Sequence, residues 1–188
     1  MAPQAYAARL TVDYPEKLGR LTTFFRLIMA IPILIVESLL SGGLWFATLL
    51  MIVFRVRYPR WWFDFAQELA RLSTRVGAYM ALLTDRYPST VEEQSVHLEI
   101  DYPDVERDLN RWLPLVKWLL AIPHYIVLGV LWLCAFVAIV IAWFAILVTG
   151  RYPRALFDFV VGVMRWTLRV YAYAFLLVTD SYPPFSLS

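Results

Sequence analysis

Two sets of charged and aromatic residues have the spacing of a single helix face. Within each set the members lie at i, i+7, i+11 and i+15, which is one face at 3.6 residues per turn. One set is Asp158, Arg165, Arg169 and Tyr173. The same residue types occur 94 positions earlier, as Asp64, Arg71, Arg75 and Tyr79. We call these two sets the stripes, and their recurrence predicts a chain built from two copies of one unit.

The stripes have two chemical interpretations. In the functional one, their four arginines line a cleft that binds an anionic headgroup or solute, because guanidinium groups recognise phosphate and carboxylate. In the structural one, the arginines are satisfied by Asp158, by backbone carbonyls, by the other copy's helix or by interfacial phosphates. The structural interpretation is favoured, because an arginine buried in a small membrane protein must be paired somewhere.

The other stripe residues add to the candidate site without adding an acid catalyst. Asp64 and Asp158 are interpreted as residues near the start of a helix, where a carboxylate is favoured by the helix macrodipole. Tyr79 and Tyr173 end the stripes. All eight stripe residues are therefore candidate contacts for an anionic lipid or a protein partner.

No familiar catalytic or metal-binding pattern is present. The chain lacks a P-loop, GxGxxG, HExxH, CxxC and GxSxG. The two histidines, His97 and His124, have no counterpart in the other copy, and haem ligation would need two histidines on facing helices. The lone Cys134 is interpreted as a small buried hydrophobe. The sequence thus predicts neither an enzyme nor a metal or cofactor site.

The composition indicates a membrane protein. The 188 residues are 61% hydrophobic, with mean hydropathy +0.61, whereas soluble domains are nearer half apolar. Eight Trp and eleven Tyr fit the aromatic belts of a bilayer interface. The formal net charge of +2 gives no reason to expect nucleic-acid binding.

The stripes must be positioned by the apolar segments that precede them. Residues 32–54 and 123–149 are predicted to be membrane spans of about 34 and 40 Å, longer than a hydrocarbon core of about 30 Å. A fresh helix is expected at each Ile-Pro pair, because proline suits a first helical turn. The segments before these pairs, 16–31 and 104–122, mix basic and apolar residues and are predicted to be interfacial helices.

The two striped helices are expected at about 60–84 and 154–179, which brings the long helices to four. Small residues Ser41, Gly42 and Gly43 in the first span would permit close helix approach or a bend. Because each copy then has two long helices, both copies enter the membrane from the same side. Such parallel repeats are related by an axis along the membrane normal.

Two short segments alternate in hydrophobicity like half-buried strands. Residues 5–14 and 96–102 match each other, and each ends in Asp-Tyr-Pro. The equivalent strands are expected to pair with each other outside the bilayer. The predicted fold is therefore mainly α and integral to the membrane, with repeats 1–90 and 91–188 and a small two-stranded β element.

Four motifs of the second copy resemble an uncharacterised family of bacterial integral-membrane proteins, a domain of unknown function. They are AIPH at 121–124, GRYPR at 150–154, FDF at 157–159 and TDSYPPF at 179–185. The first copy departs from them with AIPI at 30–33, FRVRYPR at 54–60 and TDRYPST at 84–90. The resemblance implies a multi-pass protein of the bacterial inner membrane and implies no reaction.

The functional hypothesis is a non-enzymatic accessory or scaffold subunit of a larger bacterial membrane complex. Small size, many aromatic surfaces and the lack of a catalytic motif favour it. Its expected partners are membrane lipids with anionic headgroups and other membrane-protein subunits. The alternative is a lipid- or anion-binding transporter, channel or lipid-handling factor that uses the arginines of the stripes.

Overall fold

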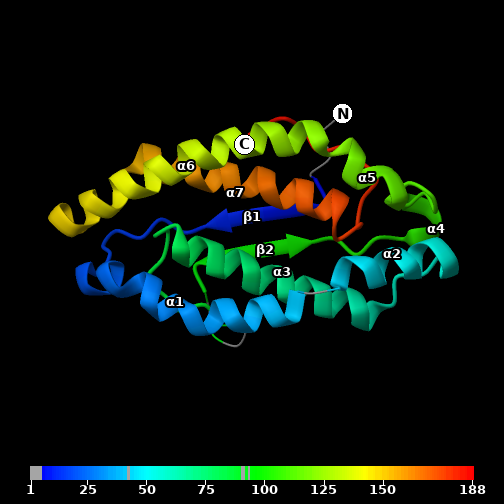
Figure 1. Cartoon of the computed structure of the whole chain (residues 1–188), viewed down its shortest axis with the longest axis horizontal. Helices are drawn as coiled ribbons and strands as arrows, with labels where there is room; N and C mark the ends of the chain where they lie inside the picture. Colours follow the sequence, from blue (N-terminus) through cyan, green and yellow to red (C-terminus); the bar gives the residue numbers. More distant parts are fainter. Residues whose placement is uncertain (1–5, 42, 90–91, 93) are drawn as a thin grey trace.

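The fold is mainly helical, with one two-stranded sheet near its centre (Figure 1). The computed structural model describes residues 6–41, 43–89, 92 and 94–188. The elements in chain order are β1 (Ala8–Val12), α1 (Arg20–Ser41), α2 (Leu44–Arg55), α3 (Arg60–Met80), β2 (Val96–Ile100), α4 (Val105–Asp108), α5 (Pro114–Leu120), α6 (Ile122–Thr149) and α7 (Arg154–Ala174).

The sheet confirms the expected strands and their pairing. β1 and β2 are antiparallel, and Leu10 lies opposite Leu98. On each strand the apolar residues are buried, apart from half-buried Val12, while the polar ones are exposed, as the alternation predicts. The exposed row includes Arg9, His97 and Glu99, so one face of the sheet is charged and the other contributes to the core.

The two copies are intertwined. β1 packs on α7, and β2 packs on α3, so the strand of each copy covers the helix of the other. The division into 1–90 and 91–188 stays a prediction, because positions 90 and 91 lie outside the described residues. The family comparison given below matches the chain twice.

Equivalent elements run in opposite directions. The strands are antiparallel, and Figure 1 shows the same for α1 with α6 and for α3 with α7. A pseudo-twofold axis perpendicular to the strands relates the copies. The expected parallel arrangement of spanning repeats is therefore wrong, since spanning helices related by an axis along the membrane normal would run in the same direction.

The proline boundaries hold in only one copy. α5 ends at Leu120, and α6 begins at Ile122 with Pro123 in its first turn, as expected. In the first copy, α1 runs through Pro32 and ends at Ser41. Pro32 removes one backbone hydrogen bond of α1, and the hydrogen bonds of the neighbouring turns keep the helix continuous. Gly43 precedes α2 with a φ of 87°, a left-handed conformation that suits glycine; Gly42 and the side chain of Ser41 lie outside the described residues.

Only two helices in the described part of the chain are long and apolar enough to cross a membrane, not the four expected. They are the run Arg20–Arg55, which joins α1 and α2, and α6. The striped helices end sooner than predicted, at Met80 in α3 and Ala174 in α7. Each is followed by a leucine whose backbone is in the left-handed conformation, Leu82 after α3 and Leu177 after α7. Both striped helices pack against the sheet, α3 on β2 and α7 on β1, as amphipathic helices do with their buried face.

Candidate functional site

Two of the stripe arginines lie against the sheet. The Nε–H of Arg71 in α3 donates to the carbonyl oxygen of Leu98 at 3.2 Å. The Nε–H of Arg165 in α7 donates to the carbonyl oxygen of Leu10, also at 3.2 Å. Each arginine therefore binds a strand of the other copy, so these two contacts tie the repeats together.

The remaining stripe arginines bind carbonyl oxygens of irregular segments. Arg75 donates to Ser89, and Arg169 donates to Ser188. Burial lowers the pKa of both guanidinium groups, and the neighbouring Arg165 lowers that of Arg169 further. All four stripe arginines donate to backbone carbonyls, as the structural interpretation predicts.

The stripe carboxylates are separate from these arginines. Asp64 pairs with Arg60 at 3.4 Å on the exposed start of α3, and Asp158 is exposed near the start of α7. Among the described residues, neither carboxylate forms an ion pair with a stripe arginine. Their positions fit residues that favour a helix start.

The stripe tyrosines lie beside two buried cations that the sequence interpretation missed. The guanidinium carbon of Arg26 lies 4.6 Å from the centre of the Tyr79 ring. The Nζ of Lys117 lies 5.2 Å from the centre of the Tyr173 ring. Arg26 is 2% exposed and Lys117 is fully buried. An aromatic face beside a desolvated cation is favourable, because the negative ring face attracts positive charge.

Both cations form the same set of contacts with the Thr-Asp turns. Arg26 pairs with Asp85, and its Nη1 donates to the carbonyl oxygens of Tyr79 and Thr84, each at 2.8 Å. Lys117 Nζ lies 2.7 Å from Asp180 Oδ1 and donates to the carbonyl oxygen of Thr179 at 2.7 Å. These pairs are charge-assisted, and their cations are buried while the carboxylates are partly exposed, so each cation needs its partner.

The carboxylates of Asp85 and Asp180 also accept hydrogen bonds from backbone N–H groups earlier in the same copy. Asp85 accepts from the N–H of Gly19, and Asp180 accepts from that of Asn110 at 2.5 Å. Burial lowers the pKa of Lys117 below its usual 10.5, while Asp180 acts in the opposite direction. Each ion pair thus fastens the turn after a striped helix to the segment that leads into an apolar helix.

A sequence signal for these pairs exists. Arg26 and Lys117 each stand six residues before the proline of an Ile-Pro pair, and the Thr-Asp turns recur in both copies. What the sequence alone lacks is the contact between segments that are 59 residues apart in the first copy and 63 in the second. Burial of a basic residue within an apolar run indicates a partner, but it does not say which one.

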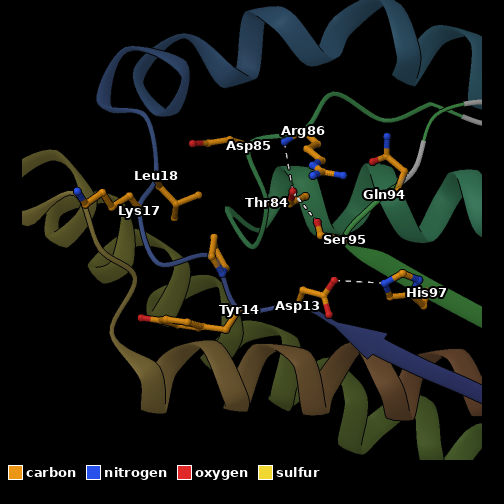
Figure 2. A pocket seen from close by; sticks show the side chains of 11 residues that line it. Asp13, Tyr14, Lys17, Leu18, Thr84, Asp85, Arg86, Gln94, Ser95 and His97 are labelled. Atoms are coloured by element: carbon orange, nitrogen blue, oxygen red, sulfur yellow. Dashed lines mark hydrogen bonds and ion pairs between the residues drawn. The ribbon is translucent and has the colours of Figure 1, made fainter.

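A cavity of about 530 Å³ lies beside the Asp85 turn, at the end of β1. Figure 2 shows Asp13 facing His97 across the sheet, with Oδ2 and Nε2 3.2 Å apart, and the Thr84 and Ser95 hydroxyls 2.8 Å apart. An equivalent cavity of about 370 Å³ lies beside the Asp180 turn. In the described residues, no three His, Cys, Asp or Glu side chains cluster closely enough to hold a metal ion.

Comparison with known proteins gives a family but no activity. The model of the family described as Domain of unknown function (DUF4389) matches residues 20–92 and again 112–186. The double match agrees with the two copies seen in the sequence and the fold. No curated protein and no solved structure matches the chain.

Proposed function

The chain belongs to the family described as Domain of unknown function (DUF4389), and we propose that it is a non-enzymatic accessory or scaffold subunit of a bacterial inner-membrane complex. In this proposal α1 and α6 are immersed in lipid, while the charged face of the sheet meets water or a partner subunit. The observation that carries the proposal is the division of the surface into an apolar part and a charged part.

The apolar part is formed by the two long helices. Leu39 of α1 is 76% exposed and Leu133 of α6 is 67% exposed, and large apolar neighbours are exposed along both helices. Soluble monomers rarely expose continuous apolar patches of more than a few hundred Å². Lipid is the partner that covers such helices without needing a complementary shape.

The charged part is the outer row of the sheet. Arg9 pairs with Glu99 at 3.3 Å and with Asp101 at 2.9 Å, and all three side chains are exposed. In Figure 1 this sheet lies beside the half of α6 that begins next to α5. If α6 crossed the bilayer, the other end of this sheet, where Asp13 lies 3.2 Å from His97, would lie at the depth of the hydrocarbon core, where charges are costly.

This geometry supports helices that lie within the membrane plane, with the pseudo-twofold axis along the membrane normal. The multi-pass arrangement expected from the sequence would require the charged sheet face to be covered by another protein. We call this arrangement, with the helices in the membrane plane, the proposed seating. It predicts that α4 and the end of α6 are on the same side of the membrane, although they lie at opposite ends of the molecule in Figure 1.

The seating is tested with single cysteines in a Cys134→Ala background. Arg107→Cys in α4 and Arg151→Cys just after α6 replace exposed residues. In sealed vesicles of one orientation, a membrane-impermeant maleimide should label both positions from the same side. Labelling from opposite sides would show that α6 spans the bilayer and would overturn the proposed seating.

The scaffold role is tested at the sheet face. Arg9→Glu replaces the cation of the outer row and should release the partner subunit during extraction in mild detergent. Arg107→Glu is the matched control, because Arg107 is highly exposed and forms only a local pair with Asp104. The measurement is the partner-to-protein ratio from affinity purification. Purification of the wild type as a lone chain in several mild detergents would reject the scaffold role.

The alternative of an anion site built from the stripe arginines is not adopted. Those guanidinium groups donate to backbone carbonyls, so an anion would have to displace bonds that hold the two copies together. A lipid site elsewhere in the molecule has better support and is considered next.

A further inference from the structure

An apolar cavity of about 640 Å³ lies between α1 and α6, next to the end of α3. This volume is within the range of about 300–1,000 Å³ typical of small-molecule sites. Its wall is almost entirely aromatic and aliphatic, and includes Phe24, Leu27, Phe136, Trp143 and Phe144. The same two helices carry the exposed apolar surface, so a hydrocarbon chain in the bilayer would reach the cavity without crossing water.

Two polar residues interrupt this wall. Thr23 and Arg26 line the cavity, and each is only 2% exposed. Thr23 Oγ1 and Arg26 Nε are buried atoms without a hydrogen-bond partner in the described part of the chain. Leaving a buried donor unpaired is costly, and native structures do so rarely. Neither atom is exposed in this structure, so an acceptor on a bound ligand would satisfy both groups once the two side chains turn toward the cavity.

The second copy has a ring where the first has open space. Ala81, which lines the cavity, is equivalent to Phe175 at the stripe offset of 94. The Phe175 ring packs against the rings of Trp45 and Tyr125, at centroid distances of 6.5 and 6.4 Å. The cavity therefore depends on a small residue at position 81, and its volume is a difference between the repeats.

We propose that this cavity binds one acyl chain of a membrane glycerolipid, with the ester carbonyl of that chain accepting from Arg26 Nε and Thr23 Oγ1. An uncharged ester suits the site better than a free fatty acid. Arg26 is already neutralised by Asp85, so an added carboxylate would be a buried charge without a counter-ion. The inference does not depend on how α6 is seated in the membrane, because binding can be measured in detergent solution.

The test compares monoolein with oleate. Both carry the same acyl chain, but monoolein has an ester group where oleate has a carboxylate. Binding to the purified full-length chain is measured by native mass spectrometry in an uncharged detergent. We expect one monoolein per chain, bound more tightly than oleate. Ala81→Phe, which introduces the second copy's residue, should weaken monoolein binding by tenfold or more. Leu133→Phe adds the same ring on the exposed surface of α6 and should leave the affinity within twofold.

Thr23→Val tests the polar contact, since it keeps the shape of the side chain and removes the hydroxyl. It should weaken monoolein by about two- to tenfold and leave oleate unchanged. Equal binding of monoolein and oleate, or unchanged monoolein binding in Ala81→Phe, would overturn the proposal. If Ala81→Phe does not fold, Val140→Phe fills the same cavity from α6, and the same outcomes apply.

Discussion

Arg71 and Arg165 hold equivalent positions in the two copies, and each donates from Nε to the strand of the opposite copy at 3.2 Å. Their acceptors, Leu98 and Leu10, face each other in the sheet. Neither copy therefore completes its own core or its own hydrogen bonds. The same exchange recurs at the ends of the molecule, where Arg20 donates to Val148 and Arg111 donates to Val53.

Arg165→Leu should destabilise the fold because it removes one of these hydrogen bonds between the two copies. The carbonyl oxygens of Leu10 and Leu187 would lose their donor, which costs about 1–3 kcal/mol for a buried group. The measurement is the thermal unfolding midpoint in detergent. Arg151→Leu, at an exposed turn residue, is the control. Equal midpoints for the two variants would contradict the role given to Arg165.

Arg26→Leu should be more damaging, because it leaves Asp85 without its cation. Removing one partner of a buried pair costs about 3–5 kcal/mol, and the lower end of that range is expected here because the Asp85 side chain is 29% exposed. Replacing both Arg26 and Asp85 by leucine should recover part of that loss, because no charge is then left unpaired. A double variant no more stable than Arg26→Leu would argue against the ion pair as the cause.

Lys117 should make stability depend on pH in the alkaline range. Burial lowers its folded-state pKa below 10.5. Between that lowered value and 10.5 the unfolded chain binds more protons than the folded protein, so stability rises with pH in this window. The midpoint of the wild type minus that of Lys117→Met should therefore increase as pH rises towards 10.5. Lys17→Met, at an exposed lysine, is the control variant, and a falling difference for Lys117→Met would contradict the sign.

Gly162→Ala should loosen the segment that follows α7. A Cβ at Gly162 would lie 2.9 Å from the Cβ of Leu187 and 3.0 Å from its carbonyl oxygen. Because Leu187 is an acceptor for Arg165, the overpacking should cost about 1–3 kcal/mol. Faster hydrogen exchange at residues 185–188 is the expected measurement. Gly129→Ala is the control, since nothing lies within 4 Å of a Cβ there, and it should be neutral or stabilising.

Several features of the fold follow from local sequence patterns. The alternation in residues 8–12 and 96–100 determines the strands, because a period of two separates a buried face from an exposed one. The repeated stripes determine two amphipathic helices and a chain of two copies. Pro123 marks the start of α6 because its ring fits a first helical turn. These features depend on residues close together in the chain.

The candidate site depended on contacts that no local pattern contains. The stripe predicted arginines that need partners, and it left open lipid phosphates, carboxylates and backbone carbonyls. The tertiary structure selected the carbonyls, because the antiparallel sheet places Leu98 over α3 and Leu10 over α7. It also brought Arg26 to Asp85 and Lys117 to Asp180, pairs separated by 59 and 63 positions.

The relative direction of the two repeats was likewise determined by the tertiary structure. A repeat offset gives the equivalence of Arg71 and Arg165 but not the symmetry operation that relates them. Pairing β1 with β2 in antiparallel register fixes an axis perpendicular to the strands, and the helices attached to the strands must then run in opposite directions. The sequence by itself therefore determined what each copy is made of, and the sheet determined how the copies face each other, because only backbone hydrogen bonds between distant strands set that direction.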